Sequence, residues 1–283
     1  MSEWIEVKAH LKAIPLDWST WDEIFEEAGV NGTVQTDEPP TISGFVPPGS
    51  EESIAELESL LLKAGASSVT TSKVDEVDWA EAWKQFFIPR RVGERFMVVP
   101  SWTEHFKAEP GDLVITLDPG QAFGTGDHPT TRGCLQLIEK VGATGKDVAD
   151  IGCGSGILSI GAGLLGAASL VAVDTEAVAC ESARENLMRN GVEGQVFQGE
   201  GFAPLPTNET YDIVLSNIIS AALIGLAHEA ARRVRPGGHW VISGVIDKNW
   251  PDVLDKAERC GFVLAEQFTE DGWIAATFAR PSA

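Results

Sequence analysis

A short glycine-rich turn between two apolar stretches most constrains how this chain folds. The turn spans residues 150–156 (DIGCGSG) and follows the apolar residues 148–151. Small and aliphatic residues from 155 to 165 predict a helix, and the next apolar stretch, 170–173, ends at the carboxylate of Asp174. This order predicts a βαβ unit in which backbone amides and a helix N-terminus face one ligand. The alternative is an ordinary αβ turn whose glycines only permit tight corners.

The spacing of the glycines distinguishes between nucleotide ligands. A dinucleotide fingerprint has glycine at the sixth position of G-x-G-x-x-G, where this chain has Ile157. Pyrophosphate binding is therefore disfavoured, while the carboxylate of Asp174 suits the hydroxyls of a ribose. Asp150, two positions before the first glycine, and Asp174 together resemble the first motifs of S-adenosylmethionine-dependent methyltransferases. We expect this cofactor to be bound by Gly152, Gly154, Gly156 and Asp174.

Strand and helix signals alternate through the larger, C-terminal part of the chain. Apolar stretches predict strands at 96–99, 113–117, 148–151, 170–173, 195–198, 213–216, 239–243, 263–268 and 273–278, with helices between the middle ones. The pattern predicts an α/β fold with a doubly wound sheet, and the last two strands are close enough to pair as an antiparallel hairpin. In such a sheet the ligand lies beyond the carboxyl ends of the strands.

The N-terminal part shows a different pattern. Extended stretches at 4–9, 33–46 and 68–73 and helical stretches at 17–28 and 51–64 predict a small α+β, ferredoxin-like domain over residues 1–74. Residues 75–90 predict an acidic, aromatic connecting helix that ends before Pro89. Residues 91–283 then form the second domain.

A glycine-containing loop precedes a predicted helix that starts at Pro129. The loop and the first helical turn span residues 118–131 (DPGQAFGTGDHPTT). Thr130 and Thr131 fall in the first turn, where hydroxyls and free amides can receive a carboxylate such as the methionine end of the cofactor. Threonine near a helix start is equally consistent with a simple cap.

Asn217 follows the apolar strand 213–216. Its carbonyl oxygen can accept the hydrogens of an amine while the amine lone pair faces an electrophilic methyl group. The alternative role is to cap the helix that begins near Ser220. We expect this strand to be an edge strand that closes the cofactor crevice, and we favour the catalytic role.

Composition excludes several classes of partner. Lys and Arg total 21 against 42 for Asp and Glu, and the net charge of −21 repels phosphate backbones, so we expect no nucleic-acid binding. The same charge favours a basic protein partner, although solubility alone also explains it. Four cysteines without a C-x-x-C pair and five scattered histidines predict no metal site. Without a signal peptide or an apolar stretch of about 20 residues, we expect a cytoplasmic protein. We also expect it to be a monomer.

These motifs together resemble the PrmA family, the methyltransferases of ribosomal protein L11. The resemblance covers roughly residues 75–283, and the F-G-T-G-x-H-x-T-T loop that begins at Phe123 is its most specific part. It implies a class I, Rossmann-like methyltransferase domain and an N-terminal domain that recognises the basic ribosomal protein. It also implies methyl transfer to lysine side chains, with the N-terminal amine as a further acceptor. The cofactor positions that it implies are Thr131, Gly152, Asp174 and Asn217. We also expect Phe123, Gly124 and Thr125 of the loop to bind the cofactor.

Other functions stay open at this point. A base-modifying amine methyltransferase is expected to carry N-P-P-aromatic, where this chain has Ile218-Ile219 after the asparagine. A methyltransferase of another protein or of a small molecule, and a non-catalytic scaffold that binds the cofactor, are the remaining alternatives. The sequence assigns no general base and no role to Asp127 or His128.

Overall fold

The structure is a computed structural model that describes residues 3–15, 18, 21, 22, 24, 25, 28, 30, 33–37, 39–46, 52–75, 88–103, 106–117, 126 and 128–282. The chain divides into two compact units, Met1–Phe87 and Ile88–Ala283. Most of the predicted connecting helix, residues 76–87, lies outside the described residues.

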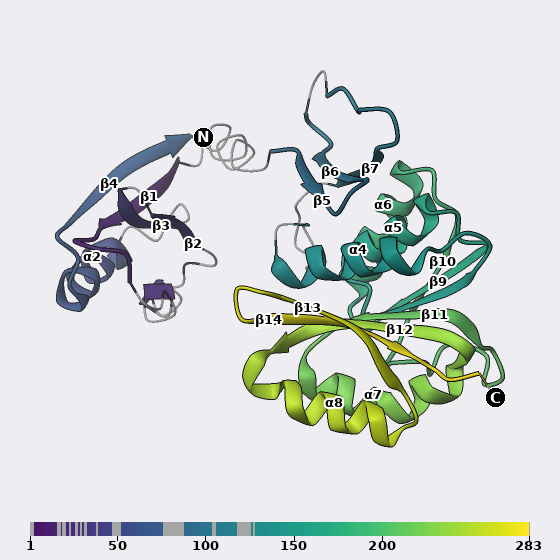
Figure 1. Cartoon of the computed structure of the whole chain (residues 1–283). Helices are drawn as coiled ribbons and strands as arrows, with labels where there is room; N and C mark the ends of the chain where they lie inside the picture. The colour runs from purple at the N-terminus through teal and green to yellow at the C-terminus, as the bar shows by residue number, and fades with distance from the viewer. Residues whose placement is uncertain are drawn as a thin grey trace. The chain divides into compact units, whose positions relative to one another are not determined.

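The first unit is an antiparallel sheet with a helix packed on it (Figure 1). Its elements are β1 (Glu3–His10), β2 (Thr33–Asp37), β3 (Pro40–Val46), α2 (Glu52–Ala64) and β4 (Ser68–Asp75). The strand order is β2-β3-β1-β4, with every neighbouring pair antiparallel. This is the predicted ferredoxin-like arrangement. The extended stretch predicted over 33–46 is in fact a hairpin of β2 and β3, because the chain turns back between Asp37 and Pro40.

The core of this unit lies between the sheet and its helical segments. Phe25, Leu57 and Leu61 are completely buried against the apolar face of β1. A Cβ atom at Gly44 in β3 would lie 2.4 Å from Cδ1 of Phe25, so the ring occupies the space that a side chain at this position would need. The burial of these side chains supplies the main stabilisation of the unit.

The second unit contains a seven-stranded sheet in the order β10-β9-β8-β11-β12-β14-β13. Its strands are β8 (Asp147–Ile151), β9 (Ser169–Asp174), β10 (Gln195–Gln198), β11 (Tyr211–Asn217), β12 (Val234–Ile246), β13 (Val263–Glu270) and β14 (Trp273–Ala279). Strands β8 to β12 are parallel, while β14 pairs antiparallel with both β12 and β13. The doubly wound sheet with a C-terminal hairpin is therefore confirmed. The expectation that 213–216 is an edge strand is wrong, because β11 lies between β8 and β12.

Helices cover both faces of this sheet (Figure 1). One face carries α4 (Pro129–Val141), α5 (Ile157–Leu164) and α6 (Ala177–Arg189), and the other carries α7 (Ser220–Arg233) and α8 (Trp250–Arg259). Two apolar cores result, one around Leu135 and Ile160 and one around Trp240 and Phe278. Because both faces are covered, the central strands are almost wholly buried, as expected for parallel strands.

A separate three-stranded sheet precedes these elements. It consists of β5 (Arg90–Val92), β6 (Phe96–Pro100) and β7 (Leu113–Leu117), in the order β5-β6-β7. The strands predicted at 96–99 and 113–117 therefore exist but pair with each other rather than with the large sheet. Phe96 and Leu117 pack into the core that contains α4 and α5.

Ion pairs connect the amino ends of the central strands β8, β11 and β12. Arg235 lies 2.7 Å from a carboxylate oxygen of Asp147, at the start of β8, and 2.7 Å from one of Asp212, near the start of β11. The carboxylate of Asp212 also accepts the backbone N–H of Asp147 at 2.9 Å. These contacts give Arg235, near the start of β12, a structural role.

Candidate functional site

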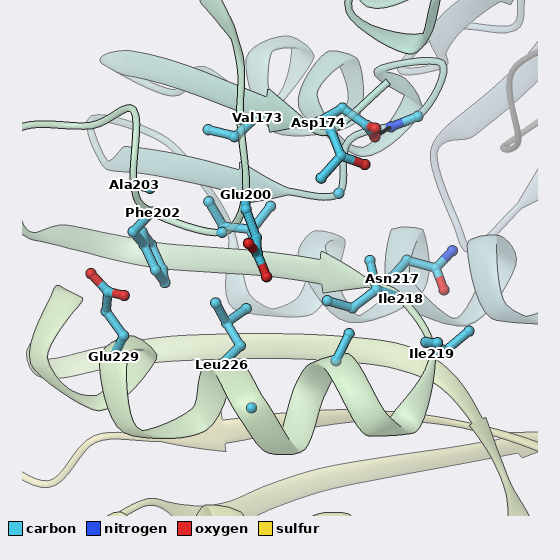
Figure 2. Close-up of a pocket in the computed structure, with 18 of the residues that line it drawn as sticks. Val173, Asp174, Glu200, Phe202, Ala203, Asn217, Ile218, Ile219, Leu226 and Glu229 are labelled. Atoms are coloured by element: carbon cyan, nitrogen blue, oxygen red, sulfur yellow. Dashed lines mark hydrogen bonds between the residues drawn. The ribbon is translucent and has the colours of Figure 1, made fainter. Parts of the chain in front are cut away.

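A cavity of about 890 Å³ opens where the strand order reverses. From β8 the chain winds outward to β9 and β10, then crosses to β11 on the other side of β8. The carboxyl ends of β8 and β11 diverge into their connections at this point, which is where ligands bind in open α/β sheets. Figure 2 shows side chains from the ends of β9 and β11, from the segment after β10 and from α7 around this space.

The glycine turn forms one wall of the cavity. Gly152, with φ 79°, and Gly154, with φ 52°, adopt positive φ, and both line the cavity. A Cβ atom at Gly152 would lie 2.2 Å from Cγ2 of Ile218, so glycine is required there for space as well as for conformation. Gly156 does not line the cavity; its Cβ would lie 3.2 Å from the Ala183 backbone in α6, which indicates a packing role.

Asp174 ends β9 and points its carboxylate toward the turn. One oxygen accepts the N–H of Gly154 at 2.9 Å, and the other accepts the N–H of Glu176 at 3.0 Å. These two bonds fix the orientation of the carboxylate, and each oxygen retains a lone pair for a further donor. The predicted ribose-binding group therefore faces the cavity beside the glycine turn.

Asp150 is fully buried behind this turn. One carboxylate oxygen accepts the Ser159 N–H at 3.1 Å and the Ser159 hydroxyl at 2.7 Å. The other oxygen has no hydrogen-bond partner among the described residues. Burial raises the pKa of Asp150 to about 7, against the bonds from Ser159, and the charge of Asp174 adds to the increase.

Asn217 and Thr131 meet at the carboxyl end of β11. The Asn217 Nδ2 lies 3.5 Å from Oγ1 of Thr131, which is fully buried in the first turn of α4. The Asn217 Oδ1 is buried and has no hydrogen-bond partner in the described part of the chain. The alternative role as a helix cap is wrong, because Ile219 is the N-cap of α7 and no side chain caps it.

His128 caps α4, which begins at Pro129 as predicted. Its Nδ1 accepts the Thr130 N–H at 3.3 Å and lies 2.7 Å from the Thr130 hydroxyl. Burial and the nearby Arg132 lower the pKa of His128, so the ring is neutral at pH 7. The histidine therefore orients the start of the helix that carries Thr131.

A second cavity, of about 550 Å³, adjoins the first. The two cavities share Asn217, Ile218, Ile219 and Ala221. His128 and Trp273 line the second cavity, and their rings stand edge to face with centroids 4.8 Å apart. Ile219, 71% exposed, contributes an apolar side chain to both cavities. Asn217 thus stands on the wall between two spaces.

Several lining residues were not predicted from the sequence. Glu200 and Phe202 follow β10, and Leu226 and Glu229 come from α7. Glu200 could have been found, since it directly follows a strand that ends at the same edge of the sheet. Trp273 has a weaker signal, because nothing local indicates that the C-terminal hairpin reaches Asn217.

Three predicted cofactor residues, Phe123, Gly124 and Thr125, lie outside the described residues, as does Asp127. Within the described residues no group of three or more His, Cys, Asp or Glu side chains is arranged to hold a metal ion. None of the described helices has the length and apolarity needed to cross a membrane.

Comparison with known proteins relates the whole chain to one family. The family model described as ribosomal protein L11 methyltransferase (PrmA) matches residues 4–281. A ribosomal protein L11 methyltransferase of Pelotomaculum thermopropionicum is 40% identical over 255 residues, which cover 88% of this chain and 82% of that protein. One of Streptococcus uberis is 37% identical over 256 residues, which cover 87% and 80%.

A solved structure agrees with this relationship. The crystal structure of a ribosomal protein L11 methylase from Lactobacillus delbrueckii subsp. bulgaricus superposes with a TM-score of 0.65 at 26% identity, covering 69% of this chain and all of that one. The glycine turn, the carboxylate of Asp174 and the amide of Asn217 thus stand in a fold that such a protein shares. This chain belongs to the ribosomal protein L11 methyltransferase (PrmA) family.

Proposed function

We propose that this protein transfers methyl groups from S-adenosylmethionine to amines of ribosomal protein L11, at lysine side chains and at the N-terminal amine. The family supports the reaction and the substrate. The mechanism rests on one observation: two adjoining cavities share a wall, and Asn217 is part of that wall. One cavity holds the donor and the other admits the acceptor amine.

The first cavity fits the donor by its chemistry. Gly152 and Gly154 allow close backbone approach, the Asp174 carboxylate suits the ribose hydroxyls, and about 890 Å³ is ample for a nucleoside with an amino-acid arm. S-adenosylmethionine supplies a methyl group on a positively charged sulfur that is already reactive toward a neutral amine. The chain therefore has to orient the two reactants and exclude water rather than form covalent bonds.

Asn217 orients the acceptor amine in this proposal. Its buried Oδ1 lacks a protein partner among the described residues and can accept an N–H of the amine, while its Nδ2 is within reach of Thr131. That arrangement directs the amine lone pair toward the first cavity. A fixed amide is suited to this task, because its oxygen accepts a hydrogen bond from the amine without taking up a proton.

The second cavity favours an uncharged amine. Ile218, Ile219, Ile246 and Trp273 give it apolar walls, and desolvation lowers the pKa of a lysine amine. The neutral His128 adds no charge next to the amine. In this proposal the amine loses its proton to solvent before it enters the cavity.

We extend the assignment to the remaining cofactor residues. Thr131 supports the site through Asn217, and Gly156 supports it through the packing of the glycine turn on α6. The assignment of Phe123, Gly124 and Thr125 rests on the loop motif that they share with the family.

We also propose that residues 1–74 recognise the basic ribosomal protein, that residues 75–90 connect the two domains, and that residues 91–283 catalyse the reaction. The net charge of −21 supports attraction to a basic protein. Hydrogen exchange of the full chain, with and without the dissociated ribosomal protein, tests this division. Protection is expected in β1 to β4; protection confined to residues 91–283 would contradict it.

We also propose that the protein is a monomer, since one chain holds both cavities, and that it is cytoplasmic, since its proposed substrate is a ribosomal protein. Light scattering of the purified chain tests the monomer. A dimer that persists at nanomolar concentration would contradict it.

Mass spectrometry tests the proposed reaction directly. The purified chain is incubated with S-adenosylmethionine and dissociated large-subunit ribosomal proteins, and intact masses are recorded. One basic protein is expected to gain one-methyl increments that Asn217→Ala abolishes, while Asn208→Ala, an exposed loop asparagine, serves as the matched control. Cofactor binding without methylation of any protein would instead support a small-molecule substrate or a scaffold.

A further inference from the structure

A buried arginine lies behind the far end of the first cavity. Arg233 is in the last turn of α7, and its side chain is 5% exposed. Its guanidinium donates to the carbonyl oxygens of Pro206 and of Glu209, the latter at 3.1 Å. It also donates to one carboxylate oxygen of Glu229, at 3.4 Å from Nε and 3.2 Å from Nη2. Arg233 itself does not line the cavity.

These contacts join the two walls at this end of the cavity. The guanidinium carbon lies 5.3 Å from the centroid of the Phe202 ring, a cation–π distance. Phe202 belongs to the segment 199–210, which follows β10, whereas Glu229 belongs to α7. Both residues line the cavity (Figure 2). One side chain therefore holds the segment 199–210 against the helix that begins just after Asn217.

A buried guanidinium is expensive to maintain unless its donors are satisfied. Apolar packing alone already anchors this segment, since Phe202 and Leu205 are buried in the core with Trp240. The planar guanidinium bonds the carbonyl oxygens of Pro206 and Glu209 and the carboxylate of Glu229, and these bonds add orientation to that anchoring. The orientation that Arg233 adds sets the shape of the cavity wall beside it.

We infer that Arg233 is a positioning residue for the nucleoside base of the methyl donor, acting through Phe202 and Glu229. This inference rests on the proposed placement of the donor. Asp174 and the glycine turn receive the ribose, so the base extends toward the segment after β10. Without Arg233 the segment 199–210 keeps its apolar anchoring but loses its fixed orientation against α7, and the base loses its close fit.

The test compares Arg233→Met and Arg233→Lys with Arg232→Met in the full-length protein. Arg232 is the neighbouring residue of the same helix and is exposed, so it controls for removal of a charge from α7. The readouts are KM for S-adenosylmethionine, KM for the protein acceptor, kcat, and the inhibition constant of adenosine, which lacks the amino-acid arm. Thermal unfolding with circular dichroism verifies the folded fraction.

Arg233→Met is expected to raise KM for S-adenosylmethionine and the inhibition constant of adenosine by a similar factor of about tenfold or more. Its kcat and its acceptor KM are expected to stay within about twofold, because uniform donor binding is what is lost. Arg233→Lys keeps the charge but lacks the planar guanidinium, so its KM for S-adenosylmethionine and its adenosine inhibition constant are expected to lie between those of the parent and of Arg233→Met. Arg232→Met is expected to match the parent in both.

Unchanged adenosine inhibition in folded Arg233→Met would overturn the inference, as would an equal loss of donor and acceptor binding. If Arg233→Met does not fold, the Arg233→Lys variant decides alone: adenosine inhibition equal to the parent would refute the role. Asp174→Asn separates this outcome from failure of the proposed function. If donor binding is unchanged in Asp174→Asn too, the placement of the donor itself is wrong.

Discussion

The amide nitrogen of Asn217 lies 3.5 Å from the hydroxyl oxygen of Thr131. The asparagine ends β11 and the threonine lies in the first turn of α4, so two segments distant in sequence meet at one point. Beside them the two cavities share a wall. The position of the Asn217 side chain is thus set by elements on both sides of the site.

Asn217→Ala is expected to lower kcat/KM for methyl transfer by about 10²-fold, the effect of losing the orientation of one reactant. The affinity for S-adenosylhomocysteine is expected to change much less, because the ribose and base contacts remain. Steady-state kinetics and calorimetric titration measure the two quantities. An equal loss of affinity and turnover would show that Asn217 only binds the donor.

Gly152→Ala is expected to abolish donor binding. The new Cβ would lie 2.2 Å from Ile218, and the residue would keep a φ of 79°. Gly191→Ala is the matched control, since φ there is 64° and nothing lies within 4 Å of the added Cβ. The control is expected to lose about 1–2 kcal/mol of unfolding free energy and to retain its affinity. Calorimetric titration and urea unfolding of both variants make the comparison.

The carboxyl of Asp150 is expected to reduce stability as pH rises. Its pKa is about 7 in the folded protein and about 3.9 when unfolded. Between these values the folded state holds a proton that the unfolded state has released, so the free energy of unfolding falls with increasing pH. Above pH 7 both states are ionised and the penalty is constant.

Urea unfolding between pH 5 and pH 8 measures this effect. Asp150→Asn keeps an oxygen that can accept the Ser159 bonds, and its stability is expected to fall less with pH than that of the parent. Asp147→Asn provides the contrast: Ser169 and Arg235 lower the pKa of Asp147, so its contribution is constant between pH 5 and pH 8 and is lost only at more acidic pH. Parallel curves for the parent and Asp150→Asn would contradict the raised pKa.

Trp273→Ala is expected to raise KM for the protein acceptor about tenfold, the value of one aromatic contact of about 1.5 kcal/mol. Trp273 lines the second cavity and not the first, so KM for S-adenosylmethionine is expected to stay unchanged. Trp273→Phe is expected to recover most of the loss. A change in donor KM alone would place the acceptor elsewhere.

The sequence predicted the parts of the site that are read from local pattern. Gly152, Asp174 and Asn217 directly follow predicted strands, and Gly154 comes two residues after Gly152. Parallel strands bring their carboxyl ends to one edge. This geometry follows from topology alone. The fold class was predictable from the alternation of strand and helix patterns, and the C-terminal hairpin from the short connection between its two strands.

The remaining parts depend on packing between distant segments. Trp273 reaches the second cavity because the hairpin folds over α4, where Arg132 and Glu270 form an ion pair at 2.9 Å. The interior position of β11 depends on strand order, which periodicity does not encode. The start of α5 at Ile157 rather than Ser155 reflects the left-handed conformation of Gly156, with φ 80°.

The ion pairs of Arg235 with Asp147 and Asp212 lie at the ends of the strands opposite to the cavities. Selection for heat resistance and selection for a new acceptor can therefore act on different residues of the same strands. We expect mostly folded proteins from a library that varies the loops after β8, β10 and β11 and keeps Arg235, Asp147 and Asp212. In such a library a loss of activity reports a change in the chemistry of the site and not unfolding of the chain.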